Sequence, residues 1–174
     1  ENYTQHFANR ATSYTIPFNF KLTYPNILSR FNQDPVIASI DNWDNLLFAG
    51  GNVVNKIIYY DNPTDYDFFI YGLNENAATQ KLENILTLLN NSFSVFNITR
   101  SKNSVTLIAQ IRNEHPLYNT TPFHQFKIQF ILRLYRNPSE ILHGFDVDCC
   151  GCGYNGTNIW LTERAELSIK EMIN

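Results

Sequence analysis

Two aspartates, Asp65 and Asp67, are separated by one residue and lead into the apolar stretch Phe68-Phe69-Ile70. Alternate residues of a β-strand point to the same face, so the two carboxylates can hold one or two divalent cations between them. Paired metal ions stabilise the entering and leaving oxygens in phosphoryl and nucleotidyl transfer. We therefore expect Asp65 and Asp67 to be both metal ligands and catalytic residues. The structural alternative, in which Asp65 closes a turn after Pro63, does not explain Asp67 on an apolar strand.

A phosphate-binding turn is expected at Gly50-Gly51, which follows the apolar run Leu46-Leu47-Phe48-Ala49 and opens a stretch with helical spacing. Glycine lets the backbone approach a phosphate closely, and a helix N-terminus offers unpaired N–H donors. We expect Gly50, Gly51 and Asn52 to cradle the phosphates of a nucleoside triphosphate. Lys56, one helical turn further on, is a candidate for phosphate contact. The alternative is a plain turn between two elements.

A third carboxylate usually completes such a site. The alternating stretch Phe126–Tyr135 has one apolar face and contains no acid, and Gln129 stands in the middle of its polar face. Phe145–Tyr154 is expected to form another strand, which would supply Asp146 as the third catalytic residue and Asp148 as a further metal ligand. The alternative is a turn at the start of this stretch, in which Asp146 accepts backbone N–H groups and Asp148 is solvated.

Ala49-Gly50-Gly51 followed by Asp65-Tyr66-Asp67-Phe68 resembles the signature of the DNA polymerase β-like nucleotidyltransferase superfamily. The similarity covers residues 46–160, and parts of it are similar to viral and phage nucleotidyltransferase-like proteins. The resemblance implies a metal-dependent transfer with Mg²⁺ or Mn²⁺ as cofactor. It also implies ATP or another nucleoside triphosphate as donor, and a hydroxyl of a nucleic acid, a protein or a small molecule as acceptor.

Gln129 supports a second hypothesis. Many members of that superfamily carry an acid on the corresponding strand, and a neutral amide cannot replace a carboxylate as metal ligand or proton acceptor. The domain could then keep the fold as a catalytically inactive binding or structural module. The pair Asp65 and Asp67 favours the enzyme, whereas Gln129 favours the module.

The elements that position these residues follow from hydrophobic spacing. Helices are expected at 25–31, 52–60, 76–89, 138–143 and 163–173, and strands at 46–49, 66–71, 94–99, 104–111, 126–135 and 145–154. The polar break at 101–103 indicates a hairpin, and 112–124 is typical of a loop. This order predicts an α/β or α+β fold, a mixed sheet with helices on one face that is nucleotidyltransferase-like. Residues 1–40 are expected to form an N-terminal arm and 41–174 the nucleotidyltransferase-like domain.

Composition narrows the class of protein. A net charge of −3 and a pI near 5.8 argue against a non-specific nucleic-acid binder, which usually shows a high pI. No apolar run is long enough to cross a bilayer and no signal-peptide layout is seen, so we expect a cytoplasmic or, if viral, virion-associated protein without a membrane partner. The three cysteines, Cys149, Cys150 and Cys152, are expected to be reduced thiols that fill a buried strand rather than zinc ligands.

Overall fold

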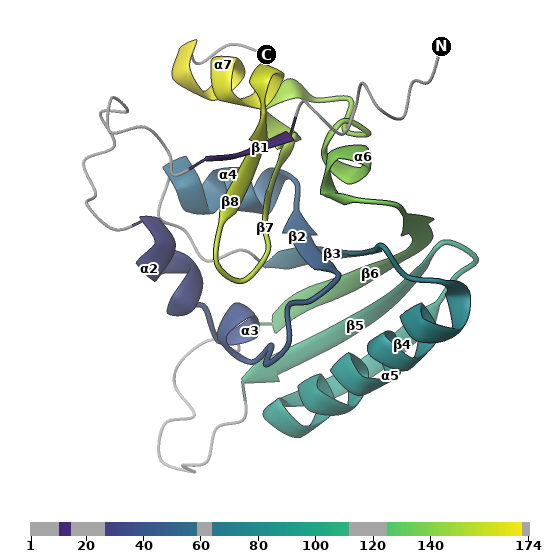
Figure 1. The fold of residues 1–174 in the computed structure, drawn as a ribbon. Helices are drawn as coiled ribbons and strands as arrows, with labels where there is room; N and C mark the ends of the chain where they lie inside the picture. The colour runs from purple at the N-terminus through teal and green to yellow at the C-terminus, as the bar shows by residue number, and fades with distance from the viewer. Residues whose placement is uncertain (1–10, 15–26, 59–63, 112–124, 172–174) are drawn as a thin grey trace, which may run out of the picture.

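The computed structural model describes residues 11–14, 27–58, 64–111 and 125–171. Within these ranges the chain forms one mixed sheet of eight strands in the order β1-β8-β7-β2-β3-β6-β5-β4 (Figure 1). The strands are β1 (Ala11–Tyr14), β2 (Leu46–Ala49), β3 (Asp65–Tyr71), β4 (Phe93–Arg100), β5 (Ser104–Ile111), β6 (Gln125–Tyr135), β7 (Cys152–Tyr154) and β8 (Ile159–Thr162). The expected mixed α/β sheet is confirmed.

The helices are α2 (Ile27–Asn32), α3 (Pro35–Ala38), α4 (Gly51–Ile58), α5 (Glu75–Ser92), α6 (Pro138–Leu142) and α7 (Glu163–Glu171), with a 3-10 turn, η2, at Asp148–Cys150. Side-chain caps fix where several of them begin. Asn74 accepts a hydrogen bond from the Ala77 N–H at the start of α5, and Thr162 accepts one from the Ala165 N–H at the start of α7.

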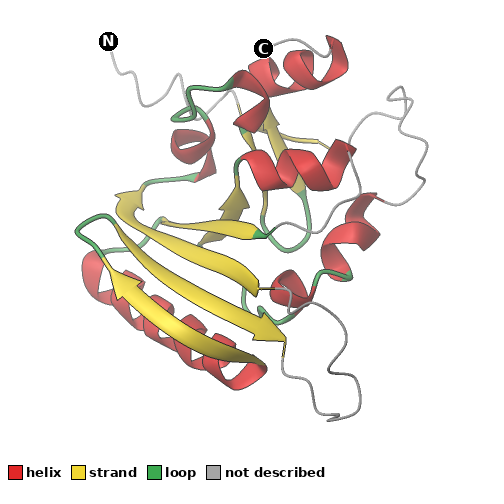
Figure 2. Ribbon diagram, turned by 180° about the vertical axis from the view of Figure 1, so that it is seen from behind, coloured by secondary structure: helices red, strands yellow, loops and turns green. Residues whose placement is uncertain are grey.

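Two hydrophobic clusters lie on opposite faces of the sheet. The larger one joins alternate strand residues such as Phe48, Phe68 and Phe130 to side chains from α2, α3, α4, α5 and α7. The smaller one joins Leu47 and Phe69 to Ile141 and Leu142 of α6, among others. Strand β2 is buried on both faces, which explains its uninterrupted apolar sequence. Figure 2 shows the long helix α5 lying across the strands β4 to β6.

Strand β6 has the period-two pattern that its sequence predicts as far as Phe130, but the expected apolar face does not stay buried beyond it, since Leu134 is 41% exposed. Phe126, Ile128 and Phe130 are buried in the larger cluster, while Lys127 and Gln129 are only half-buried on the other face. Strand β3 runs parallel to β6, whereas the other pairings of the sheet are antiparallel. The register sets Asp65 opposite Lys127 and Asp67 opposite Gln129. Polar residues from two distant segments thus share the face that the larger cluster leaves open.

The expected strand Phe145–Tyr154 is wrong over most of its length. Gly144 ends the turn after α6, η2 occupies Asp148–Cys150, and only Cys152–Tyr154 forms a strand. The end of the expected helix 52–60, the expected loop 112–124 and the end of the expected helix 163–173 lie outside the described residues, as does most of the expected arm over residues 1–26. Phe31 of α2 and Val36 of α3, from the segment expected as an N-terminal arm, pack in the larger cluster.

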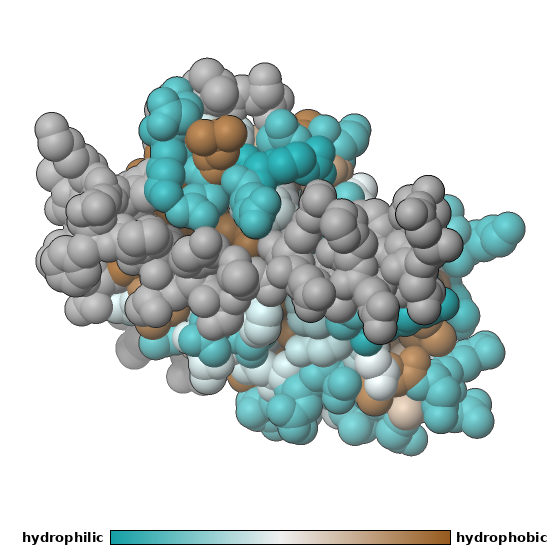
Figure 3. Space-filling model, turned by 45° about the horizontal axis from the view of Figure 1, so that its top comes forward, coloured by the Kyte–Doolittle hydropathy of each residue, from teal (hydrophilic) through white to brown (hydrophobic). Residues whose placement is uncertain are grey.

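None of the helices in the described ranges combines the length and hydropathy that crossing a bilayer requires. On the face drawn in Figure 3 the described residues are mostly hydrophilic, with hydrophobic residues in small separate groups.

Candidate functional site

Asp65 and Asp67 lie on the open face of β3, as their spacing predicts. The alternating partners on the other side of the strand, Tyr66 and Phe68, are buried in the larger cluster. Burial of these two aromatic rings fixes which way the strand faces, because a shift by one residue would drive both carboxylates into the core. The acids are therefore held on the open face by the packing behind them.

Lys127 is the cation of this site. Its Nζ lies 2.9 Å from Asp65 Oδ2, and both side chains are close to half exposed. The hydrogen bond to Asp65 is the main cause that raises the pKa of Lys127, and the negative charge of Asp67 acts in the same direction. The sequence argument missed Lys127, although its place on the polar face of β6 was visible. Its partner became apparent only with the parallel register of β3 and β6.

Of the two acids, Asp67 has fewer polar partners among the described residues than Asp65. Burial raises the pKa of Asp67, Lys127 lowers it in part, and the like charge of Asp65 raises it further. Within the described part of the chain, no group donates a hydrogen bond to the Asp67 carboxylate. A carboxylate that is desolvated without donors favours an additional cation beside it.

The glycine turn lies between β2 and α4, as predicted, and α4 begins at Gly51. Gly50 has a φ of 101°, a conformation that favours glycine, and its N–H donates to the Cys152 carbonyl. The Asn52 side-chain amide donates a short hydrogen bond to the Asp65 backbone carbonyl. Asn52 thus ties the start of α4 to the strand that carries the acids.

The two aspartates expected to complete the site do not join it. Asp148 begins η2 and its Oδ1 lies 2.8 Å from Arg164 Nη1. Asp146 lies in the turn before η2, where its charge contributes to a raised pKa of Cys150. In the described ranges, no three acids, histidines or cysteines come together in a metal-binding group. Asp146 and Asp148 thus lie in a turn rather than a strand, as the alternative had it, but Asp148 pairs with Arg164 instead of being solvated.

Gln129 takes the place opposite Asp67, and the Thr106 hydroxyl of β5 donates to its Oε1 at 3.4 Å. Position 129 therefore offers an amide where a third acid would stand, and the polar face continues through β6 into β5.

Lys56 does not contact the open face. It lies on the buried side of α4, where Nζ is 2.8 Å from Asp34 Oδ2 and its side chain is 2% exposed. The expectation of phosphate contact was wrong because the partner of Lys56 comes from the loop between α2 and α3, which no local pattern reveals.

The cysteines are free thiols, and Cys152 is buried in the larger cluster. Burial and the neighbouring Cys149 raise the pKa of the Cys150 thiol to about 11. Cys150 Sγ would lie 3.8 Å from a Cβ at Gly51, so this thiol packs beside the glycine turn. Neutral thiols of this kind are poor metal ligands at neutral pH.

Comparison with known proteins gives a family and a relative. The model of a family described as Gad2, Gabija anti-defense 2 family protein, matches residues 19–170. A protein of Acanthamoeba polyphaga mimivirus, named as uncharacterized, is 34% identical over 154 residues, which cover 81% of this chain and 34% of the relative. The chain thus spans about a third of the length of that relative.

The family match corrects the expected membership of the polymerase β-like nucleotidyltransferases and the viral nucleotidyltransferase activity inferred from it. The glycine turn and the spaced aspartates are real features of the site, but they were too short a signature to fix a family. The active set expected with them is also incomplete in the described residues, since neither Asp146 nor Asp148 joins Asp65 and Asp67.

Proposed function

The chain belongs to the Gabija anti-defense 2 family, and we propose that it acts in anti-defense as a binding protein for a nucleoside triphosphate and its divalent cation. The observation that carries the proposal is the Asp67 carboxylate. It is partly desolvated, receives no hydrogen bond from the described residues, and lies on one face with Asp65 and Lys127. A site of this kind is stabilised when a cation and its anionic ligand enter it.

The donor set fits a magnesium ion that arrives with its ligand. Mg²⁺ is commonly held by one or two carboxylates, with phosphate oxygens and water filling the other positions. Asp65 and Asp67 would supply the two carboxylates. Lys127 has a flexible four-carbon stem, so its ammonium can leave Asp65 and contact a phosphate oxygen. Gly51, the first residue of α4, would supply the close backbone approach to a phosphate.

Binding a nucleotide requires fewer protein groups than transferring it to an acceptor does. Gln129 faces Asp67 from β6 and cannot act as a proton acceptor or a strong metal ligand. The charge balance between two carboxylates, one lysine and a bound metal–phosphate group does not depend on a third acid. The function proposed is therefore capture of the ligand, with the anti-defense effect following from its retention.

Calorimetric titration of ATP into the protein, with and without Mg²⁺, tests the proposal. We expect binding that requires Mg²⁺ and that the Asp67→Asn variant weakens at least tenfold, about 1.4 kcal/mol, because the amide no longer neutralises the metal. The control is Glu83→Gln, which removes one exposed negative charge from α5, away from the site. It should bind as the unmodified protein does.

Two results would contradict the proposal. One is the absence of Mg²⁺-dependent ATP binding in the unmodified protein. The other is an equal loss of binding in Asp67→Asn and Glu83→Gln, since that would show only an effect of net charge. In cells that carry the Gabija defense, Asp67→Asn should also reduce the anti-defense effect of the chain, whereas Glu83→Gln should retain it.

A further inference from the structure

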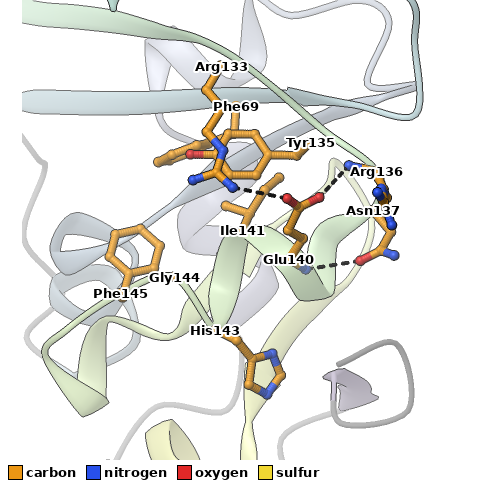
Figure 4. Close-up of a pocket in the computed structure, with 10 residues that line it drawn as sticks. All are labelled: Phe69, Arg133, Tyr135, Arg136, Asn137, Glu140, Ile141, His143, Gly144 and Phe145. Carbon is orange, nitrogen blue, oxygen red and sulfur yellow. Dashed lines mark hydrogen bonds and ion pairs between the residues drawn. The ribbon is translucent and has the colours of Figure 1, made fainter. Parts of the chain in front are cut away.

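A pocket of about 420 Å³ lies on the open face of the sheet and is lined by Phe69, which is two residues along β3 from Asp67 (Figure 4). Its walls come from three parts of the chain: Phe69 of β3, the end of β6 with the turn after it, and α6 with Gly144 and Phe145. The volume lies in the range of small-molecule sites. The proposed function does not use this pocket, although Phe69 follows Asp67 by two residues on the same face.

Three aromatic rings form its apolar part. The Phe69 and Tyr135 rings meet at 5.8 Å with an interplanar angle of 72°, and the Phe69 and Phe145 rings meet at 5.9 Å with the same angle. Phe69 thus makes edge-to-face contacts with both of the other rings. Flat apolar surfaces in this arrangement suit another planar ring, because offset and edge-on contacts are the favoured geometries of aromatic groups.

The polar part of the pocket is a network of hydrogen bonds and one ion pair around Glu140. The Arg133 guanidinium lies over the Tyr135 ring at 4.9 Å from its centroid, and its Nη2 is 3.1 Å from Glu140 Oε1. Glu140 also accepts the Arg136 N–H at 2.7 Å, and Asn137 caps α6 by accepting the Glu140 N–H, as Figure 4 shows. The Arg133 side chain is still 68% exposed, so its planar group remains open to a ligand. The pocket therefore offers a planar cationic group beside aromatic rings, with hydrogen-bonding groups at its edge.

The pocket also touches the glycine turn. A Cβ at Gly50 would lie 3.2 Å from the Phe145 ring, so this ring lines the pocket and packs against the start of the phosphate-binding turn. Along β3, Phe69 is about 7 Å from Asp67, a gap that a sugar can bridge. One ligand can thus reach from the carboxylates and the turn into the aromatic pocket.

We propose that this pocket binds the nucleobase of the nucleotide whose phosphates lie at Asp65, Asp67 and the glycine turn. The inference rests on the proposed function, since it assigns the other end of the same ligand. Tyr135 and Arg133 provide the stacking surface, and the Glu140 and Asn137 side chains at the pocket edge can hydrogen-bond polar groups of the base. The pocket thus makes the protein select a nucleotide over a bare polyphosphate.

Calorimetric titrations with Mg²⁺–ATP and with Mg²⁺–tripolyphosphate distinguish binding of the base from binding of the phosphates. We expect ATP to bind about fivefold or more tightly than tripolyphosphate, because stacking of a base contributes that much. Tyr135→Leu should remove this preference and leave tripolyphosphate binding unchanged. The matched control is Phe96→Leu on β4, which truncates an aromatic ring that is 53% exposed and does not line the pocket. It should preserve the preference.

A second variant and a second measurement guard against a folding defect in Tyr135→Leu. Arg133→Gln changes an exposed side chain and should reduce the preference for ATP in a protein whose melting curve is unchanged. In saturation-transfer NMR, the base protons of ATP should receive more saturation than the ribose protons.

Equal affinity for ATP and tripolyphosphate would overturn the base site while leaving the metal–phosphate site in place. Saturation that is no stronger on the base than on the ribose would overturn it as well, and so would an equal loss of both ligands in Tyr135→Leu and Arg133→Gln. If neither ATP nor tripolyphosphate binds, the proposed function and this inference fail together.

Discussion

The buried ion pair between Lys56 and Asp34 permits a quantitative test of the packing behind the site. Lys56 Nζ lies 2.8 Å from Asp34 Oδ2, and the side chains are 2% and 0% exposed. Asp34 also accepts the Tyr66 hydroxyl at 2.9 Å and the N–H groups of Val36 and Ile37 at 2.9 and 3.0 Å. Removing one member of such a pair leaves a buried charge and costs about 3–5 kcal/mol.

The surroundings of each partner decide which change costs more. Lys56→Met leaves Asp34 with three hydrogen-bond donors, so we expect the lower end, about 3 kcal/mol. Asp34→Ala leaves the ammonium buried and also removes the cap of α3, a further loss of about 1 kcal/mol, so we expect roughly 4–6 kcal/mol. Lys56→Met combined with Asp34→Asn removes both charges of the pair and should be more stable than Asp34→Ala.

Urea unfolding followed by circular dichroism measures these free energies of unfolding. The control is Lys170→Met, because Lys170 pairs with Glu166 one turn away near the surface of α7, where such a pair contributes about 0–1 kcal/mol. Equal losses in Lys56→Met and Lys170→Met would refute the argument. So would a double variant less stable than Asp34→Ala.

Two further predictions concern the site itself. Burial raises the pKa of Asp67 above 3.8, so its contribution to stability is fully present below pH 3.8 and is lost as the pH rises through the raised value. Ligand-free Asp67→Asn should therefore melt higher than the unmodified protein at pH 7, a gain that disappears below pH 3.8; an unchanged or lower melting temperature at pH 7 would contradict this. Gly50→Ala should lower the free energy of unfolding by about 1–3 kcal/mol, because φ is 101° and the new Cβ would lie 3.2 Å from Phe145. Gly51→Ala, in the first turn of α4 with Cys150 Sγ 3.8 Å away, should be neutral or stabilising, and similar losses in both variants under urea unfolding would be inconsistent with a strained turn at Gly50.

Local patterns in the sequence predicted much of the sheet. Leu46–Ala49 is apolar on both faces because β2 is buried on both, and the alternation of Phe126–Phe130 matches one buried and one open face. These patterns depend only on which residues avoid water. The same argument placed Asp65 and Asp67 on one face of β3.

The failures arose where distant contacts override the local pattern. Phe145–Tyr154 was expected to be a strand. Instead, Asp148 forms an ion pair with Arg164, and the 3-10 turn η2 ends at Gly151. A Cβ at Gly151 would lie 2.7 Å from Thr162 Oγ1, so close packing against the start of α7 requires glycine there. Lys56 and Lys127 were misjudged or missed because their partners, Asp34 and Asp65, are remote in sequence. The spacing of residues along the chain does not reveal which remote residues form such ion pairs.

The parallel pairing of β3 with β6 has a consequence for the order in which the molecule folds. Strands β4, β5 and β6 are antiparallel, and β4 and β5 meet across a short hairpin turn, whereas the contact of Asp65 with Lys127 closes a separation of 62 residues. Closing a long loop costs more chain entropy than closing a short one. We therefore expect the β4–β5 hairpin to form before β3 pairs with β6. The acids and their lysine meet only when that pairing forms. A ligand that bridges them would bind the completed fold alone and slow its unfolding.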